Sequence, residues 1–350
     1  MPPLLSLFYP AFSSQKTEQV LSILQIVLYN KEVEFLRQDR GLPQVRPPRK
    51  GHGRRIPEPE EEPGIVRSVN MENYEKTGYL KNDFRIFHLK DARKMDIAYH
   101  YHDFDKIVLF LSGDVTYSIE GRRYELRPYD IILVNAGEIH RPVIHSDMPY
   151  ERIIIYVSSG FMREYADESY DLSRCFQEAR EKHGNVLRID NLEKSSLFAV
   201  CRELERSFSS QEYANELYQK VLFLEFMIWL NRALIHNHAN YLENEVSNEK
   251  IAAIVDYINA HLKEEITVDG LAEHFFVSRS YLMHLFKAET GYSIGSYISE
   301  KRLLLAKTQI QNGMSVTEAC YACGFKDYST FSRAFKKKFR TTPKHSGKII

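Results

Sequence analysis

Cysteine is scarce in this sequence. The 350 residues include only four, which are Cys175, Cys201, Cys320 and Cys323. So few cysteines in so long a chain do not form the dense disulfide framework of small secreted proteins. The Cys320-x-x-Cys323 pair lacks the second pair of a structural zinc site, so we expect it to pack between helices. A reducing compartment fits this composition best.

Long hydrophobic runs are also missing. The most apolar stretches, near residues 21–29 and 221–230, are interrupted or shorter than the roughly 20 residues that cross a bilayer. The N-terminus has no cationic segment ahead of its apolar run and no small-residue cleavage site after it. We therefore expect neither a membrane span nor a signal peptide.

Net charge is absent as well, because 47 Lys and Arg balance 47 Asp and Glu. The balance is uneven along the chain. Residues 248–350 carry 15 basic against 10 acidic side chains, a net charge of +5, and most of the excess lies beyond Tyr321. This asymmetry favours an anionic partner, such as nucleic acid, for the C-terminal region.

The length predicts at least two domains, since a single core seldom grows beyond about 250 to 300 residues. Residues 1–70 end in a segment crowded with proline, arginine and glutamate (PPRKGHGRRIPEPEEEPG), which cannot bury much apolar surface. We expect a disordered extension there, or sequence upstream of a true start at Met71. The alternative is an arm whose basic cluster, Arg49 to Arg55, touches DNA.

Residues 71–160 are predicted to be a β-rich domain. Between Phe84 and Val157, short runs of Ile, Val, Leu, Tyr and Phe alternate with turn signals, for example at 112–114 and 135–137. Short strands at such spacing predict a β-sandwich or small barrel. Glu120-Gly121 lies between two tyrosine-bearing runs and predicts a hairpin.

Residues 161–243 are predicted to be a helical arm. Its longest helix, 213–234, repeats apolar residues at spacings of 4, 3 and 4, which are Leu217, Val221, Leu224 and Ile228. Further apolar residues widen the stripe, so one side can pack on the β-rich domain. The other side then needs a partner, and we weigh a second copy in a homodimer against burial within its own domain. The polar stretch 241–248 is the predicted linker.

Residues 248–350 are predicted to be helical throughout. An apolar stripe over 251–262 predicts a first packing helix. Thr267 and Ser278 are then natural N-caps for a short helix and a longer one that follows it. With Leu282 and Phe286 packed inward, the longer helix turns a polar and basic face outward. Such a face on the second helix of a pair is typical of a helix that enters the major groove of DNA.

The same design then repeats. A long helix over 294–312 is followed by Ser315 and Glu318, which form a capping box at the start of another short helix. Asp327 then caps a final helix whose phenylalanines recur at every fourth residue, namely Phe331, Phe335 and Phe339. The outer face of this helix carries hydroxyl and basic side chains.

The run from Ile266 to Pro343 closely resembles the DNA-binding domain of the AraC/XylS family of bacterial regulators. Two motifs carry the resemblance, VSRSYLMHLFKAETGYS in the first unit and ACGFKDYSTFSRAFKKKFRTTP in the second. The resemblance implies two helix-turn-helix units joined by one helix, bound to double-stranded DNA as a transcription regulator. It also implies that the exposed early turns of both recognition helices contact the bases.

The outward faces of the two recognition helices supply the candidate DNA contacts. They are Arg279, Ser280, Met283, His284 and Lys287 in the first unit, and Tyr328, Ser329, Thr330, Arg333, Lys336 and Lys337 in the second. Two positions depart from the family pattern. Arg340 stands where a glycine commonly follows the last recognition helix, and residues 345–350 lack the usual aromatic and basic ending.

The β-rich domain resembles the cupins over residues 84–157. Its motif residues are His100-Tyr101-His102, Asp105, Gly113 and Gly121, followed by Asp130, Gly137 and His140. The resemblance implies a cupin-like barrel, which AraC-family members often carry as a sensing domain. In metal-binding cupins two His, one Glu and a third His hold a divalent ion, and here Asp105 stands in place of the Glu while Asn135 replaces the usual Pro. The candidate ligand-binding residues are therefore His100, His102, Asp105 and His140.

Three interpretations of these histidines compete. They can hydrogen-bond a small polar effector such as a sugar, with Tyr and Phe stacking on it. They can instead hold the metal of a cupin enzyme with an appended DNA-binding domain, which requires a complete ligand set and an open coordination position. In the third interpretation they are satisfied core side chains, and the protein is a DNA-binding adaptor with an empty barrel. We favour the effector site and predict no catalytic residue, bound metal or cofactor.

The whole sequence predicts an α+β multidomain fold, with an N-terminal cupin-like β-barrel and its helical arm followed by an all-α domain of two helix-turn-helix units. We expect a cytoplasmic transcription regulator that responds to a small molecule such as a carbohydrate. Its expected partners are double-stranded DNA, a second copy of the chain, and RNA polymerase if it is an activator. No membrane partner is expected.

Overall fold

The strands of the N-terminal domain form two antiparallel sheets whose inner faces share one buried cluster. The computed structural model describes residues 80, 83–91, 96–236, 239–242 and 249–346. The predicted extension at 1–70 and most of the predicted linker lie outside these residues. The described residues belong to one unit, which spans residues 68–350.

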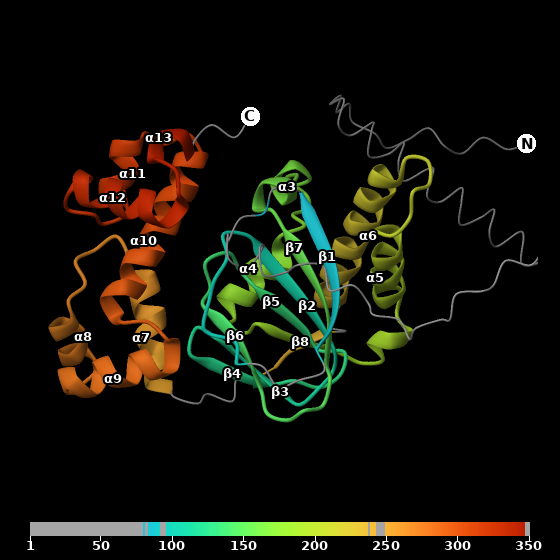
Figure 1. Cartoon of the computed structure of the whole chain (residues 1–350), viewed down its shortest axis with the longest axis horizontal. Helices are drawn as coiled ribbons and strands as arrows, with labels where there is room; N and C mark the ends of the chain where they lie inside the picture. Colours follow the sequence, from blue (N-terminus) through green and yellow to red (C-terminus); the bar gives the residue numbers. More distant parts are fainter. Residues whose placement is uncertain (1–79, 81–82, 92–95, 237–238, 243–248, 347–350) are drawn as a thin grey trace, which may run out of the picture. The chain divides into compact units, whose positions relative to one another are not determined.

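The larger sheet has six strands and the smaller has three (Figure 1). The order in the larger sheet is β1 (Phe84–Asp91), β7 (Tyr150–Val157), β2 (Asp105–Ser112), β5 (Ile131–Val134), β8 (Val186–Ile189) and β9 (Ala239–Tyr241). The order in the smaller sheet is β4 (Arg122–Glu125), β3 (Val115–Ile119) and β6 (His140–Ile144). The predicted Glu120-Gly121 hairpin joins β3 to β4, and both of its turn residues have positive φ, as a two-residue hairpin loop requires.

The larger sheet is apolar on both faces, because successive side chains of a strand point to opposite sides. In β2, Val108 and Phe110 point between the two sheets, whereas Ile107 and Leu109 point toward helices. Residues 131–134 of β5 divide in the same way and all four are buried. This double burial explains why these strands show continuous apolar runs instead of the alternation of a half-exposed sheet.

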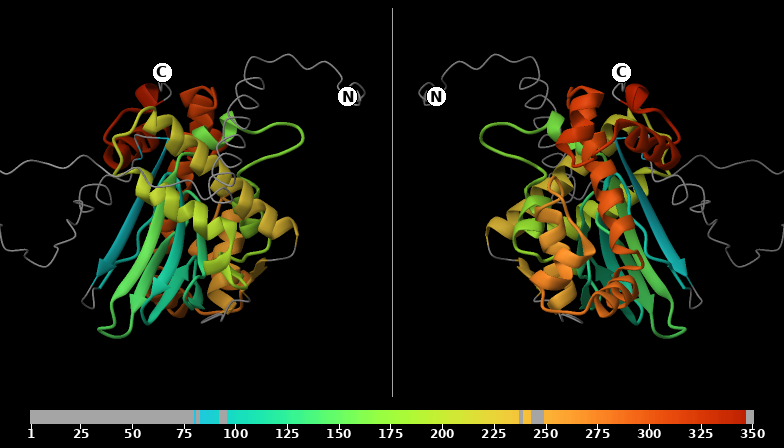
Figure 2. Two further views of the ribbon diagram at one scale, coloured as in Figure 1. Left: turned by 90° about the vertical axis from the view of Figure 1, so that its right-hand side faces the viewer. Right: turned by 90° about the vertical axis from the view of Figure 1, so that its left-hand side faces the viewer.

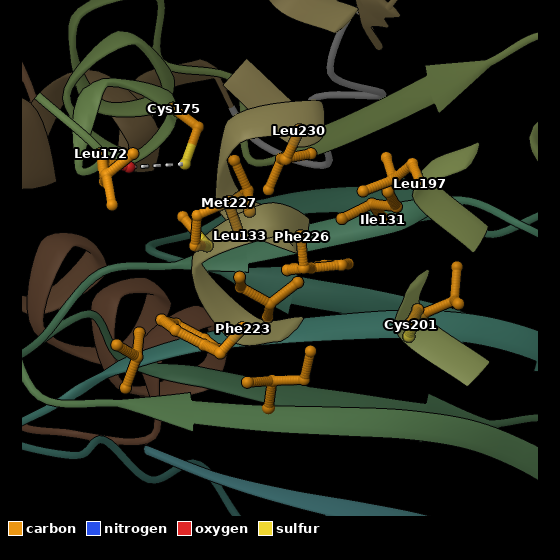
Figure 3. Packing of buried hydrophobic residues seen from close by; sticks show 14 of the residues in the cluster. Ile131, Leu133, Leu172, Cys175, Leu197, Cys201, Phe223, Phe226, Met227 and Leu230 are labelled. Atoms are coloured by element: carbon orange, nitrogen blue, oxygen red, sulfur yellow. Dashed lines mark hydrogen bonds between the residues drawn. The ribbon is translucent and has the colours of Figure 1, made fainter. Parts of the chain in front are cut away.

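The helices of the arm cover the outer face of the larger sheet (Figures 1 and 2). They are α3 (Ser159–Glu164), α4 (Arg174–Glu181), the short 3-10 helix at Leu192–Lys194, α5 (Ser196–Ser207) and α6 (Asn215–Ile235). Figure 3 shows Phe223, Phe226, Met227 and Leu230 of α6 pointing into this layer, which also holds Cys175. One side of α6 therefore packs on the β-domain, as predicted, and the cysteine is a buried thiol.

Two strands within the arm were not predicted. Residues 161–242 were expected to be helical, but β8 and β9 extend the larger sheet beyond β5. Both strands are short, with four and three residues, so neither has room for a recognisable alternation. Their assignment depends on the edge that β5 offers, which is a tertiary constraint.

The C-terminal region is helical throughout its described residues. Its helices are α7 (Glu249–Ala260), α8 (Val268–His274), α9 (Arg279–Thr290), α10 (Ile294–Gln311), α11 (Val316–Ala322), α12 (Tyr328–Phe339) and α13 (Pro343–Ser346). The predicted caps are present, since the side chains of Thr267, Ser278, Ser315 and Asp327 each accept a hydrogen bond from a backbone N–H of the following turn. Among the described helices, none is both long enough and apolar enough to cross a membrane.

Arg340 occupies the position at which the family that this sequence resembles usually has glycine, and the backbone conformation there explains the preference for glycine. It ends α12 in the left-handed conformation, with φ 56° and ψ 13°. A side chain costs about 1 kcal/mol in this region, and glycine avoids most of that cost. The structure thus keeps the expected turn despite the arginine.

We predict that Arg340→Gly raises the free energy of unfolding by about 0.5 to 1 kcal/mol, because it removes this backbone strain. Lys337→Gly is the matched control, since it removes the same charge from an exposed interior position of the same helix. Lys337→Gly should lower the free energy of unfolding by about 1 kcal/mol, because glycine is unfavourable inside a helix. Urea unfolding of both variants measures the difference, and a loss of stability in Arg340→Gly would contradict the argument.

Candidate functional site

The first helix-turn-helix unit is built around α7, α8 and α9. Its buried cluster contains Ile254 and Ile258 of α7 and Leu282 and Phe286 of α9. This inward packing fixes the rotation of α9 about its own axis. The opposite side of α9 must therefore face solvent.

All five residues predicted to contact DNA from the first unit are exposed. They are Arg279, Ser280, Met283, His284 and Lys287. Arg279 is held by Asp269 of α8 through two hydrogen bonds of 2.7 and 2.8 Å. An exposed ion pair of this kind contributes little free energy, so the guanidinium can exchange the carboxylate for a DNA phosphate. Tyr281 is also 52% exposed in the first turn of α9, and our sequence prediction did not include it.

The second unit is built around α10, α11 and α12. The phenylalanine ladder of α12 is buried as predicted, with ring centroids 5.5 Å apart for Phe331 and Phe335 and 4.5 Å for Phe335 and Phe339. Gly324 makes the turn with φ +86°, and a Cβ there would come within 2.7 Å of the carbonyl oxygen of Leu262. Only glycine fits both the backbone angle and the space.

The outer face of α12 carries the predicted polar and basic residues. Five of the six are exposed, namely Ser329, Thr330, Arg333, Lys336 and Lys337. Tyr328 is half-buried beside the Phe331 ring, so its ring supports the first turn of the helix while its edge stays accessible. The Nε of Arg333 donates only a 3.3 Å hydrogen bond, to the carbonyl oxygen of Ser329, which leaves most of its guanidinium donors to a ligand.

The cysteine pair of the second unit is part of its core. Cys320 and Cys323 are both buried in the cluster formed by α10, α11 and α12. Burial raises the pKa of both thiols, to about 11 for Cys323, and so disfavours the thiolate that a metal would need. This packing agrees with the sequence prediction for the pair.

The three histidines of the barrel lie together. His100 and His140 form an isolated antiparallel bridge, and the ligand nitrogens of His100, His102 and His140 all lie within 4.8 Å of one another. The Nδ1 atoms of His100 and His140 lie 2.9 Å from the backbone carbonyl oxygens of Ala98 and Glu138. Because a carbonyl only accepts, each Nδ1 carries the proton and each Nε2 offers a lone pair.

The environment keeps these imidazoles neutral. Burial first, and then the Lys106 ammonium, lowers the pKa of His100 to about 4 and the pKa values of His102 and His140 well below the ordinary value. The Nε2 of His100 and both ring nitrogens of His102 are buried and have no hydrogen-bond partner among the residues that the structure describes. Unsatisfied buried polar atoms are costly, so the cluster is suited to a ligand that supplies hydrogen bonds.

The structure brings the three histidines together but does not bring the carboxylate of Asp105 to them. Its carboxylate accepts a hydrogen bond of 2.8 Å from the backbone N–H of Ala136, and burial raises its pKa to about 6. Lys106 takes the inward position instead, with its Nζ 3.4 Å from the Nε2 of His140. The alternation of side chains along a strand explains why Lys106 and not Asp105 faces the histidines, because residue 106 shares the inner face of β2 with Val108 and Phe110. The same alternation would have predicted this from the sequence.

The cluster fits a divalent metal ion poorly. Three neutral nitrogen donors are present, but the carboxylate of the usual cupin set is directed elsewhere. The Lys106 ammonium would also repel a second cation in the cluster, since unit charges about 4 Å apart interact by about 4 kcal/mol at an effective dielectric of about 20. We therefore derive no chemical step through a metal.

Both domains of this chain resemble those of known proteins. A model described as an AraC-like ligand binding domain matches residues 87–226, and one described as a helix-turn-helix domain matches residues 271–348. The HTH-type transcriptional activators RhaS of Shigella sonnei and of Escherichia coli are 25% identical over 254 residues, which is 71% of this chain and 87% of theirs.

Solved structures match the helical region and, more weakly, both domains. The C-terminal domain of AraT, a response regulator from Geobacillus stearothermophilus, is 24% identical over 29% of this chain and 87% of its own, with a TM-score of 0.29. ToxT from Vibrio cholerae is 15% identical over 75% of this chain and 97% of its own, with a TM-score of 0.31. These TM-scores are low, so the family assignment depends on the sequence matches.

An AraC-like ligand-binding domain is thus followed by a helix-turn-helix domain. The chain belongs to the AraC family of DNA-binding transcription regulators.

Proposed function

We propose that this regulator inserts α9 and α12 into successive segments of the major groove and that a small polar molecule in the barrel controls the insertion. One observation carries the DNA part. In α9 the side chains of Leu282 and Phe286 are buried, and in α12 the phenylalanine ladder is buried. The side chains that remain exposed are mainly polar or basic, with Tyr281 and Met283 of α9 as the large apolar exceptions. A helix of this kind fits a groove about 12 Å wide, and two of them would reach groove segments roughly 34 Å apart.

The roles of individual residues follow from their chemistry. Arg333 lies in the second turn of α12 and can donate two hydrogen bonds to a guanine edge. Lys336 and Lys337 lie further along the helix, where an ammonium attracts phosphates by releasing counterions. Met283 donates no hydrogen bond, so its contact would be apolar, for instance with a thymine methyl group.

Arg333→Ala should weaken binding to a preferred DNA site by about 1 to 3 kcal/mol and relax the preference at one base pair. Lys337→Ala should weaken binding to all sequences alike and reduce the slope of log affinity against log salt by about one. The site is first selected from random double-stranded DNA with the full chain. Titrations of both variants on selected and random duplexes then compare the effects. An equal loss on both duplexes for Arg333→Ala would refute its role in base recognition.

The barrel part of the proposal is an effector site rather than an active site. The neutral imidazoles of His100, His102 and His140 can accept or donate hydrogen bonds. The buried rings of Phe104 and Tyr156 lie beside His102, and the Phe104 ring is stacked on the His102 ring. Alternating polar and stacking contacts suit a sugar or a similar polyhydroxy compound. The curated relatives are described as transcriptional activators, so we infer control of transcription without catalysis, in the cytoplasm, and with RNA polymerase as a partner if this chain also activates.

A sugar that binds the barrel and is present at a concentration about 100 times its dissociation constant should stabilise the protein by about 2.7 kcal/mol. A thermal-shift screen detects a change of this size. His102→Ala should abolish the shift because the hydrogen-bonding ring is lost. His284→Ala, on the exposed face of α9, is the control and should retain the shift. The alternative of a metal-dependent protein replaces this proposal if no polyhydroxy compound stabilises the chain but a divalent metal ion does so at a stoichiometric ratio.

We also propose that two chains pair through α6. Its buried side is directed to the larger sheet. In the apolar stripe of Leu217, Val221, Leu224 and Ile228, the side chains of Leu224 and Ile228 are only partly covered by the same cluster. The spacings of 4, 3 and 4 are those of helices that pack side by side. Leu217 is 51% exposed within one chain, and a second copy would cover it.

Leu217→Glu should therefore shift the protein from dimer to monomer, because pairing would bury the new charge. Met148→Glu is the matched control, since Met148 is 54% exposed on the loop before β7. Analytical ultracentrifugation of the full chain at several concentrations gives the oligomeric state. A dimer that tolerates Leu217→Glu as well as it tolerates Met148→Glu would place the interface elsewhere.

A further inference from the structure

Each imidazole of the barrel cluster is next in sequence to a residue that packs on the DNA-binding domain. Residues 99–102 and 139–140 are held together by the His100–His140 bridge, with N–H to O distances of 3.1 and 2.8 Å. Side chains alternate along such extended segments. His100 and His102 point to the cluster, so Tyr99 and Tyr101 point to the other side. We refer to residues 99–102 and 139–140 as the bridge segments.

The outer side of the bridge segments completes the core of the first helix-turn-helix unit. Ile139 is only 2% exposed and belongs to the same buried cluster as Ile251 and Tyr297. Tyr99 and Tyr101 pack against that cluster. The first unit therefore buries part of its apolar surface against the barrel, not against itself.

Tyr99 also touches the end of the first recognition helix. Gly291 terminates α9 with φ +76°, and a Cβ at that position would lie 2.7 Å from the Cδ2 of Tyr99. The tyrosine ring thus rests directly on the backbone where α9 ends. A shift of this ring cannot be absorbed there without a shift of the helix end, because packed interiors deform little.

Ion pairs surround this apolar contact. Glu120, in the β3–β4 turn, accepts hydrogen bonds from the Nζ of Lys301 at 2.7 Å, from the Nδ2 of Asn259 at 3.4 Å and from the hydroxyl of Tyr297. Arg123 donates to Glu289, near the end of α9, at 3.0 Å. Because Glu120 and Lys301 are largely buried, separating them would leave costly unpaired charges. The barrel therefore holds the first unit in one position.

The second unit is different. Within the described part of the chain, the members of its buried cluster come from α10, α11 and α12 and the turns between them, and none comes from the barrel. It meets the barrel through the largely buried ion pair of Asp103 with Lys307, and through the Lys338 ammonium, which lies 4.0 Å from the centre of the Tyr101 ring. Leu304 also lies close to Gly137 of the barrel. The second unit thus has a core of its own, whereas the first shares its core with the barrel.

We propose that the bridge segments transmit the state of the histidine cluster to α9, so that the effector controls the first recognition helix while the second remains independently folded. This inference rests on the proposed effector site and names how that site regulates DNA binding. A ligand that hydrogen-bonds the imidazoles moves the bridge segments, and Tyr99 and Ile139 carry the movement into the first core. The ligand then changes the populations of two arrangements of α9 according to its affinity for each.

Hydrogen exchange of the full chain tests the proposal without a ligand. Tyr99→Ala changes the outer side of the bridge segments, and His102→Ala changes the inner side without a direct contact to the DNA-binding domain. Both substitutions should accelerate amide hydrogen exchange about tenfold in residues 268–290. The exchange rates of residues 316–339 should stay within about twofold of their values in the protein without the substitution. Val108→Ala is the matched control, because it alters a fully buried barrel residue outside the bridge segments. It should leave residues 268–290 unaffected.

The proposal is overturned if His102→Ala leaves residues 268–290 unchanged, if it accelerates both units alike, or if Val108→Ala has the same effect. Should Tyr99→Ala not fold, Ile139→Val removes a single methyl group from the same contact and is held to the same criterion. The readout needs no effector. A thermal-shift screen without a hit would therefore refute the proposed barrel ligand and leave the exchange result standing as the test of transmission.

Discussion

The burial of one side of each recognition helix is the constraint on which the rest of this structure depends. Leu282 and Phe286 rotate α9, and the phenylalanine ladder rotates α12, so that the remaining side of each helix faces solvent. Burial of such side chains contributes about 1.5 to 3 kcal/mol each, far more than an exposed ion pair. Apolar packing therefore determines which side of each helix faces solvent, and the exposed charges contribute little to this orientation.

The barrel uses a second, simpler rule, the alternation of side chains along extended chain. It places Lys106 rather than Asp105 beside the histidines, and it gives the larger sheet two apolar faces, one for the barrel interior and one for the arm. The same rule sets the imidazoles and the tyrosines of residues 99–102 on opposite sides of one segment. The histidine cluster, which we propose as the effector site, and a contact with the DNA-binding domain are thereby separated by the thickness of a single chain.

The sequence predicted the helical region well because its signals are local. Caps at Thr267, Ser278, Ser315 and Asp327, together with regular apolar spacing, determine where each helix begins and which side it buries. The turn at Arg340 also formed as its family pattern implies, although the residue is not glycine.

The barrel was harder to predict, because its details depend on residues far apart in sequence. Strands β8 and β9 exist only because β5 leaves an edge open, and no pattern within three or four residues reveals that. The three histidines were identified from a motif, but the motif alone assigned Asp105 to the site. The shared core of the first unit could not be foreseen either, since the apolar residues Ile139 and Tyr99 look like any others in a β-domain.

The central claim is that two outward helix faces of one chain read one side of a DNA duplex. Hydroxyl-radical footprinting of the full chain on its selected DNA measures this most directly. The account predicts two protected patches on the same face, about one helical turn of roughly 10 base pairs apart, with protection that weakens as salt is added. A single patch, or protection that does not depend on salt, would contradict it.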